Sequence, residues 1–163
     1  MNVETFIPNK LFVLKNFLSE AQCGELISRA ESLTFSEAMI SARAGQVMDK
    51  TVRNNDRILF DDHALAKSCY ERAEPFLVRR WFSRKLLSFN ERWRFYRYEK
   101  GQQFRPHYDG RFVRNEQEQS EFTFLVYLND DFQGGSNTLS GSKTHFHLAT
   151  NWRRSGLLPQ AAS

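Results

Sequence analysis

The order of the hydrophobic patterns is the feature that most constrains the fold, because helical spacing comes first and strand-like segments dominate afterwards. The first helical segment begins with Ser19 and Gln22, which form a capping box. Its apolar residues recur at the i, i+3, i+4, i+7 spacing of one helical face: Cys23, Leu26, Ile27 and Ala30. We therefore expect an amphipathic helix that packs by this face on the rest of the protein.

A second helix is expected after Asp61 or Asp62, either of which can serve as its N-cap, and it should end near Pro75. Its apolar stripe consists of Leu65, Cys69 and Ala73. Strand-like segments lie at 11–14, in a short stretch that ends at Phe60, and at 93–98, 107–112 and 122–128. Because the helices do not alternate regularly with the strands, we expect an α+β fold with helices packed on an antiparallel sheet or barrel.

Composition limits the class of protein and its compartment. A chain of 163 residues with 40% apolar residues is expected to form one globular domain. Cys23 and Cys69 both lie in helical segments, which predicts free thiols in a reducing compartment. The N-terminus has no basic segment followed by an apolar core, and no run approaches the roughly 18 apolar residues of a membrane helix. We expect a cytoplasmic or nuclear location and no membrane partner.

The basic stretch at residues 79–97 allows two interpretations. It holds seven basic residues and one acidic residue, Glu91, interleaved with aromatic residues. Such a segment can bind single-stranded nucleic acid by base stacking and phosphate contacts. The favoured interpretation is a solvated face whose long basic side chains cover apolar core, because the net charge of +4 is a mild excess. A nucleic-acid partner is therefore not expected.

His107 and Asp109 form the most specific chemical pattern in the chain. In a strand, residues two apart point to the same face, so their side chains are expected to meet. An imidazole and a carboxylate so placed can fill two adjacent positions around Fe(II), as in a facial triad of two histidines and one carboxylate. The alternative interpretation is an exposed histidine paired with an aspartate in a turn.

The surrounding residues favour the metal-site interpretation. Tyr98 and Gly101 precede His107, Gly110 follows Asp109, and residues 122–135 read FTFLVYLNDDFQGG. This arrangement resembles the prolyl 4-hydroxylase-like family of Fe(II)- and 2-oxoglutarate-dependent dioxygenases. The likeness extends more loosely over residues 6–135 and includes RNNDR at 53–57.

The resemblance implies a fold and a reaction. The fold is a double-stranded β-helix, or jelly roll, with N-terminal helices packed on it. The reaction is hydroxylation of a prolyl side chain or a similar unactivated carbon by dioxygen, with release of succinate and carbon dioxide from 2-oxoglutarate. Fe(II) is the implied cofactor and L-ascorbate an auxiliary. The substrate is a protein or a small molecule.

The resemblance also assigns roles to individual residues. His107 and Asp109 correspond to the first two iron ligands. Tyr98 and Tyr127 correspond to residues that line the 2-oxoglutarate pocket, and an ordinary amphipathic core is the alternative for both. Because of the period-two rule, the expected pocket wall consists of Thr123, Leu125 and Tyr127. Arg57 is a candidate contact to the substrate, with a surface arginine at the start of a strand as the alternative.

The C-terminal part departs from the family pattern. Only 28 residues follow Gly135, and residues 136–163 contain no Asp or Glu. No evident segment supplies the distal histidine and the following cation, so the third iron ligand stays open, with His145 and His147 as the available histidines. We expect a domain at 1–135 that is incomplete at its C-terminus and a divergent, poorly ordered tail at 136–163. A non-catalytic truncated remnant that acts as a binding or regulatory module is the alternative function.

Overall fold

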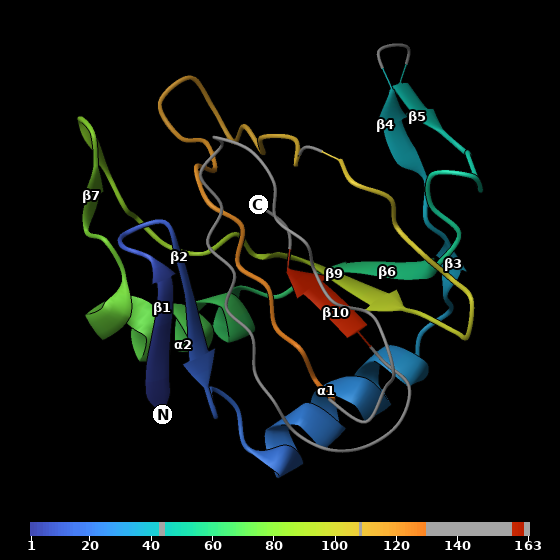
Figure 1. Cartoon of the computed structure of the whole chain (residues 1–163), viewed down its shortest axis with the longest axis horizontal. Coiled ribbons are helices and arrows are strands. Elements are labelled where there is room, and N and C mark those ends of the chain that lie inside the picture. Colours follow the sequence, from blue (N-terminus) through green and yellow to red (C-terminus); the bar gives the residue numbers. More distant parts are fainter. Residues whose placement is uncertain (43–44, 108, 130–157, 162–163) are drawn as a thin grey trace.

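The computed structural model describes residues 1–42, 45–107, 109–129 and 158–161, and Figure 1 shows their arrangement. Two α-helices and small antiparallel sheets make a mixed α+β fold, which confirms the predicted class. In chain order the elements are β1 (Asn2–Ile7), β2 (Leu11–Lys15), α1 (Glu20–Glu31), β3 (Ser36–Glu37), β4 (Ile40–Ala42), β5 (Gly45–Val47), β6 (Asp56–Asp61), α2 (His63–Ala73), the 3-10 helix η1 (Glu74–Phe76), β7 (Arg80–Trp81), β8 (Arg84–Lys85), β9 (Arg92–Arg97) and β10 (Leu158–Ala161).

The largest sheet has the strand order β10-β9-β6-β3. In its central pair, Ile58 lies opposite Phe95 and Arg57 lies opposite Tyr96. Since neighbouring residues of a strand point to opposite faces, the first pair belongs to the hydrophobic core and the second faces the other side. The sheet therefore separates an apolar face from a face that carries arginine and tyrosine.

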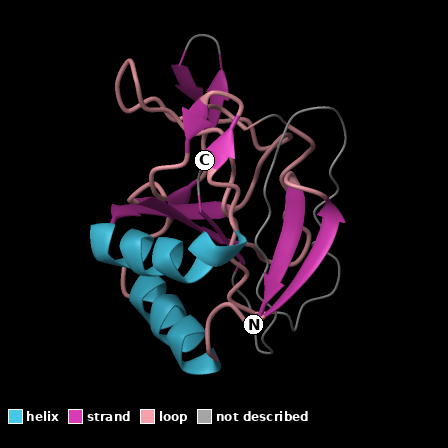
Figure 2. Ribbon diagram, turned by 90° about the vertical axis from the view of Figure 1, so that its left-hand side faces the viewer, coloured by secondary structure: helices cyan, strands magenta, loops and turns pink. Residues whose placement is uncertain are grey.

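The two long helices lie on the apolar side of this sheet (Figure 2). The predicted capping box of α1 is confirmed, because the Ser19 hydroxyl accepts from the Gln22 amide and the Gln22 side chain accepts from the Ser19 amide. Asp62 caps α2 by accepting from the amide of Leu65, so the second of the two predicted caps is the one used. Neither helix of the described ranges has the length and apolar content to cross a membrane.

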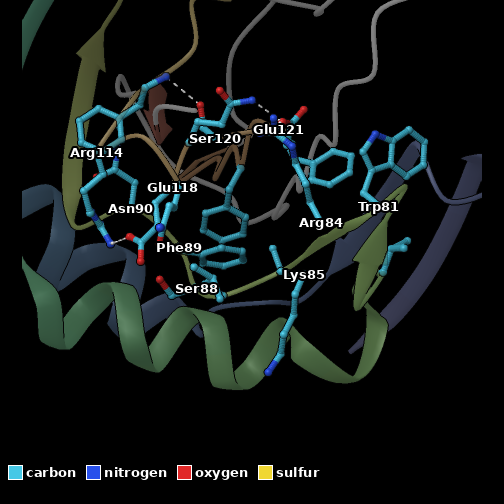
Figure 3. A pocket seen from close by; sticks show the side chains of 18 of the residues that line it. Trp81, Arg84, Lys85, Ser88, Phe89, Asn90, Arg114, Glu118, Ser120 and Glu121 are labelled. Atoms are coloured by element: carbon cyan, nitrogen blue, oxygen red, sulfur yellow. Dashed lines mark hydrogen bonds and ion pairs between the residues drawn. The ribbon is translucent and has the colours of Figure 1, made fainter.

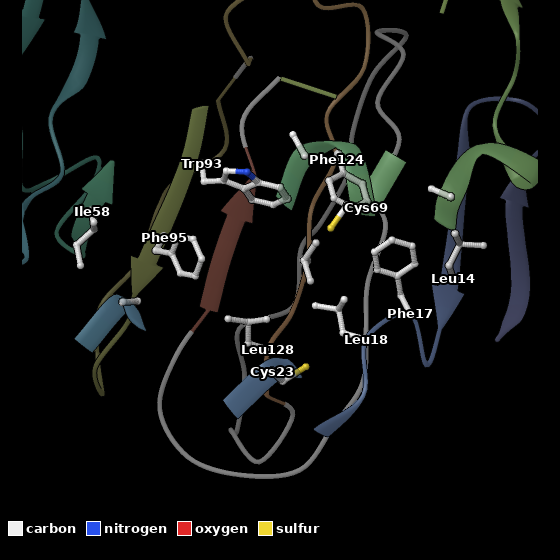
Figure 4. Packing of buried hydrophobic residues seen from close by; sticks show 14 of the residues in the cluster. Leu14, Phe17, Leu18, Cys23, Ile58, Cys69, Trp93, Phe95, Phe124 and Leu128 are labelled. Carbon is white, nitrogen blue, oxygen red and sulfur yellow. The ribbon is translucent and has the colours of Figure 1, made fainter. Parts of the chain in front are cut away.

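Aromatic side chains join the helices to the sheet, as Figure 4 shows. Phe124 is central: its ring stacks on Phe89 with the centroids 4.1 Å apart and meets Phe17 and Trp93 edge to face. Edge-to-face and offset-stacked rings add stabilisation beyond the area they bury. The core thus connects the segment after Asp109 to β2, α2 and β9.

Two predicted strands are wrong in the described part of the chain. Residues 107 and 109–112 and residues 122–128 pair into no sheet, and no closed or jelly-roll sheet occurs among the described residues. The sequence predicted neither strand of the β4–β5 and β7–β8 hairpins. Of the β1–β2 hairpin it predicted only the second strand, β2. A strand exists only when a partner satisfies its backbone groups, and the local alternation of residue types does not specify that partner.

The predicted boundary at residue 135 lies outside the described residues, as do residues 136–157 and 162–163 of the predicted tail. Four residues of that tail, β10, pair antiparallel with β9, and Leu158 lies opposite Tyr96. The central strand β9 therefore has a hydrogen-bonded neighbour on each side.

Both cysteines are buried and free, as predicted. Burial is the main cause that raises the pKa of the Cys23 thiol to about 11 and that of Cys69 to about 12. A buried protonated thiol is a poor nucleophile, because the thiolate is the reactive form. These cysteines therefore act as small apolar core residues.

The raised thiol pKa values predict that the protein loses stability in alkaline solution. A group with a higher pKa in the folded state stabilises it fully below the pKa of the unfolded thiol, and this contribution falls as the pH rises towards 11 or 12. Between pH 8 and 10 we expect a loss of roughly 1–2 kcal/mol per thiol in the free energy of unfolding. Urea titrations at both pH values measure it. In the double variant Cys23→Ala, Cys69→Ala this pH dependence should be smaller, and an unchanged slope would contradict the assignment.

Candidate functional site

The segment before His107 is held against the segment before β6. Arg53 and Phe104 face each other in an isolated antiparallel bridge. Next to it, the amide of Arg105 donates to the carbonyl of Val52 at 2.9 Å. This short ladder carries the chain to His107, two residues farther on, and fixes it beside the sheet.

His107 and Asp109 lie side by side, with 3.4 Å between Nε2 of the imidazole and Oδ1 of the carboxylate. The other ring nitrogen, Nδ1, is 2.8 Å from the carbonyl oxygen of Arg105. A carbonyl oxygen can only accept, so Nδ1 donates, and in the neutral ring Nε2 carries the lone pair. A proton on Nε2 or a metal ion between the two groups is compatible with this distance. His107 is exposed and lies in a loop, so the geometry also fits the alternative interpretation of an exposed histidine paired with an aspartate.

The electrostatics of His107 agree with this geometry. Burial lowers the pKa of the imidazole, whereas the hydrogen bonds to Asp109 and to the Arg105 carbonyl raise it, and the net effect is a raised pKa. The pair therefore attracts positive charge. The ring of Phe104 stacks on the imidazole with the centroids 3.6 Å apart and the planes inclined by 15°, which restricts its rotation.

The segment 122–128 places its alternate side chains as the sequence predicts, although it pairs into no sheet. Phe124 and Val126 lie in the hydrophobic core. Thr123 points the other way, and its hydroxyl donates to Oδ2 of Asp109 at 2.7 Å. Leu125 is buried outside the core cluster. Of the predicted pocket wall, Thr123 therefore lies beside Asp109.

Tyr98 and Tyr127 are both largely withdrawn from water. Burial is the main cause that raises the pKa of both phenols to about 12. Like an ordinary phenol, each hydroxyl is protonated at neutral pH, and a phenol O–H can donate to a carboxylate oxygen.

Arg57 lies in β6 and its side chain is partly buried, on the sheet face opposite the core. Its Nη2 donates to Oε1 of Gln46 in β5 at 3.5 Å. The interpretation as a surface arginine is therefore incomplete, because much of its guanidinium is withdrawn from water. Burial is the main cause that lowers its pKa.

The basic stretch at 79–97 is divided among several ion pairs. Arg92 pairs with Asp61, Arg97 with Asp56, and Arg84 with Glu121. The aromatic residues Trp93 and Phe95 between them are in the core. These cations and rings therefore do not form one surface for stacked bases.

A concave feature lies between the β7–β8 hairpin and residues 112–124 (Figure 3). This cavity of about 430 Å³ is lined by aromatic residues that include Trp81, Phe89 and Phe122, with Arg84 and Glu121 at one end. Nδ2 of Asn90, which also lines it, is buried without a hydrogen-bond partner. The sequence did not predict this cavity, because its walls come from the β7–β8 hairpin and from residues 112–124.

His107 and Asp109 offer donors for two of the coordination positions of a divalent metal ion. Among the described residues, no group of three or more His, Cys, Asp or Glu is placed to hold a metal ion. His145 and His147, the predicted candidates for the third ligand, lie outside the described residues. In the described part of the chain, His107 and Asp109 would supply only two of the ligands of such an ion.

No known protein family, curated protein or solved structure matches this chain. The likeness to prolyl 4-hydroxylases rests on the sequence pattern and stays a prediction.

The hydroxyl of Thr123 should contribute to metal binding by orienting Asp109. Thr123→Val removes the 2.7 Å hydrogen bond, and loss of such an outer-shell contact weakens metal affinity by about 10–100-fold. Thr123→Ser keeps the hydroxyl and should stay close to the wild type. Mn(II) titration followed by electron paramagnetic resonance measures both variants. Equal affinity of wild type and Thr123→Val would show that the hydroxyl does not support a metal ligand.

Proposed function

We propose that this chain is an Fe(II)- and 2-oxoglutarate-dependent dioxygenase of the prolyl 4-hydroxylase type, which hydroxylates a protein prolyl residue or a similar unactivated carbon. The observation that carries the proposal is the pair His107–Asp109, with Nε2 turned to the carboxylate at 3.4 Å and Nδ1 committed to a backbone carbonyl. Imidazole and carboxylate on one side of an ion, with further positions open, form the donor set of non-haem iron oxygenases. L-Ascorbate is included as an auxiliary reductant.

The residues around this pair have distinct tasks in the proposal. Bound Fe(II) would supply the redox chemistry that couples dioxygen to 2-oxoglutarate. His107 and Asp109 would hold it, and the Thr123 hydroxyl keeps the carboxylate in place. Tyr98 and Tyr127, whose phenols are protonated at neutral pH, would donate to 2-oxoglutarate and exclude water with their rings.

The finer description of fold and location belongs to the same proposal. The helices and the sheet β10-β9-β6-β3 would be part of a jelly roll that is incomplete at its C-terminus. A cytoplasmic or nuclear location is supported by two buried free thiols.

The proposal is tested with the purified chain, Fe(II), 2-oxoglutarate, ascorbate and dioxygen. We expect succinate release, measured by mass spectrometry, that disappears when iron, 2-oxoglutarate or dioxygen is left out. Leaving out ascorbate should slow the reaction without abolishing it. Absence of succinate in the complete mixture would reject the enzymatic function.

A non-catalytic module that binds a partner is the second candidate. It is favoured by the lack of a third protein ligand among the described residues. This candidate predicts metal binding in the weak range typical of two ligands, together with no succinate release. The two readouts, metal affinity and succinate, therefore separate the candidates.

A further inference from the structure

The tip of the β7–β8 hairpin carries an exposed aromatic residue that the proposed function does not use. Trp81 lies opposite Arg84 in this hairpin, so Phe82 and Ser83 form its two-residue loop. Phe82 is 86% exposed, and Figure 1 shows β7 at the margin of the molecule. A large apolar side chain is therefore presented to water at a projecting turn.

The backbone of Phe82 is unfavourable as well. Its φ is 51°, in the left-handed region that bulky side chains rarely adopt. Of the two loop residues only Phe82 has a positive φ, and a hairpin loop with a positive φ at its first residue alone is the type II′ pattern, which favours glycine there. A phenylalanine that is both strained and exposed at a position suited to glycine indicates a role in binding another molecule.

Neighbouring rings hold Phe82 in place. Its ring meets Trp81 edge to face with the centroids 5.1 Å apart, and Trp81 meets Phe122 in the same manner at 5.3 Å. A side chain that is already ordered loses little conformational entropy when it binds. Aromatic residues are enriched at protein interfaces, where they fill apolar pockets of the partner. Phe82 thus has the properties of an interface anchor.

The chain also contains a pocket that suits such an anchor. The cavity of about 430 Å³ begins beside Phe82, because Trp81 and Ser83 line it, whereas Phe82 itself stands outside it. Phe89 and Phe122 give it aromatic walls. A cavity of about 150 Å³ is enough to hold benzene, so this one can receive a phenyl ring. Since anchor and pocket are adjacent on one surface, two copies related by a twofold axis can exchange anchors, and the contact closes as a dimer.

The charges on the two sides of the cavity are complementary. Arg80 and Lys85 lie opposite each other in the hairpin, an unfavourable pairing of like charges, and none of the described carboxylates forms an ion pair with either. Figure 3 shows Glu118 on the side of the cavity opposite Arg84. Glu116, in the same turn, is exposed and pairs with no cation of the described residues. In a twofold contact the basic hairpin of one copy faces this acidic turn of the other.

We propose that the chain forms a twofold dimer in which Phe82 of each copy fills the aromatic cavity of the other. Arg80 and Lys85 of one copy lie near Glu116 of its partner in this dimer. One contact thereby accounts for the exposed ring, its conformation and the unpaired charges around the cavity. The inference does not depend on iron or on the proposed reaction.

The first test is sedimentation equilibrium of the purified chain over a range of micromolar concentrations. We expect a reversible equilibrium between monomer and dimer that weakens as the salt concentration rises. Phe82→Gly should weaken association at least about 10-fold. Its melting temperature, measured where the chain is monomeric, should equal or exceed that of wild type, because glycine adopts the positive φ without strain. The matched control is Phe6→Ala: Phe6 is 58% exposed in β1 and does not line the cavity, so association should stay unchanged.

A mixing experiment tests whether the anchor enters the cavity. Ser88 lines the cavity and is exposed, so Ser88→Phe fills it with a ring and should also weaken self-association. A mixture of Phe82→Gly and Ser88→Phe, both checked by circular dichroism, combines one free cavity with one anchor. Its mixed dimer should be tighter than the dimer of either variant alone. A monomeric wild type, a Phe82→Gly variant that dimerises like wild type, or a mixture that associates no better than its components would overturn the inference.

Discussion

Replacing either His107 or Asp109 by alanine should abolish 2-oxoglutarate-dependent succinate release and weaken Mn(II) or Fe(II) binding by more than about 100-fold. The physical reason is the geometry of the pair, since Nε2 and Oδ1 lie 3.4 Å apart and can share one cation. With one ligand removed, the remaining group has to hold the ion alone. Loss of a direct ligand should therefore weaken metal binding more than loss of the Thr123 hydroxyl does.

The matched control is His63→Ala. His63 is exposed at the start of α2 and outside the candidate site, so its removal should leave metal affinity and succinate release unchanged. Metal affinity is measured separately from succinate release. A variant that folds and binds metal but releases no succinate is therefore distinguished from one that has lost the metal. Succinate release that persists in both His107→Ala and Asp109→Ala would refute the assignment of the two ligands.

The largest effect on stability is expected for Phe124→Ala, which should lower the free energy of unfolding by about 3–5 kcal/mol. Phe124 is 8% exposed and touches three other aromatic rings, from Phe17, Phe89 and Trp93. Its truncation leaves a void among these three rings, because they cannot close over it without losing their own contacts.

Urea unfolding followed by tryptophan fluorescence measures this change. Phe82→Ala is the matched control: Phe82 is 86% exposed, and its replacement should change stability by less than about 0.5 kcal/mol. In conditions where Phe124→Ala stays folded, its metal affinity should be close to that of wild type, because Phe124 faces the core and Thr123 faces Asp109. A loss below about 1 kcal/mol would show that the core does not depend on this ring.

The helices were predictable because their signals are local. Ser19 and Gln22 satisfy each other's backbone amides within one turn, and the side chain of Asp62 reaches an amide three residues away. The apolar spacing behind each cap then selects the buried face. Such short-range bonds form in the same way whatever the rest of the chain does, so the sequence is sufficient to place them.

Of the candidate site, only the alternation of side chains along the segment 122–128 was predictable. Thr123 and Phe124 point to opposite sides as a period of two requires. However, the strand predicted at 107–112 is wrong in its described residues, and His107 and Asp109 meet in a loop. Spacing of i and i+2 brings the side chains together here without a sheet, because the bridge at Phe104 and the bond from His107 to the Arg105 carbonyl fix the loop.

By itself the sequence determined the two capped helices, the free thiols and the opposite sides to which Thr123 and Phe124 point. Only the tertiary structure decided which strands pair and that Arg53 is buried between Tyr96 and Phe104. The physical reason is range: caps and periodicity act over a few residues, whereas the surroundings of Arg53 come from a strand and a loop more than forty residues farther along the chain. A charged side chain looks solvent-exposed in a sequence until the fold brings rings to both of its faces.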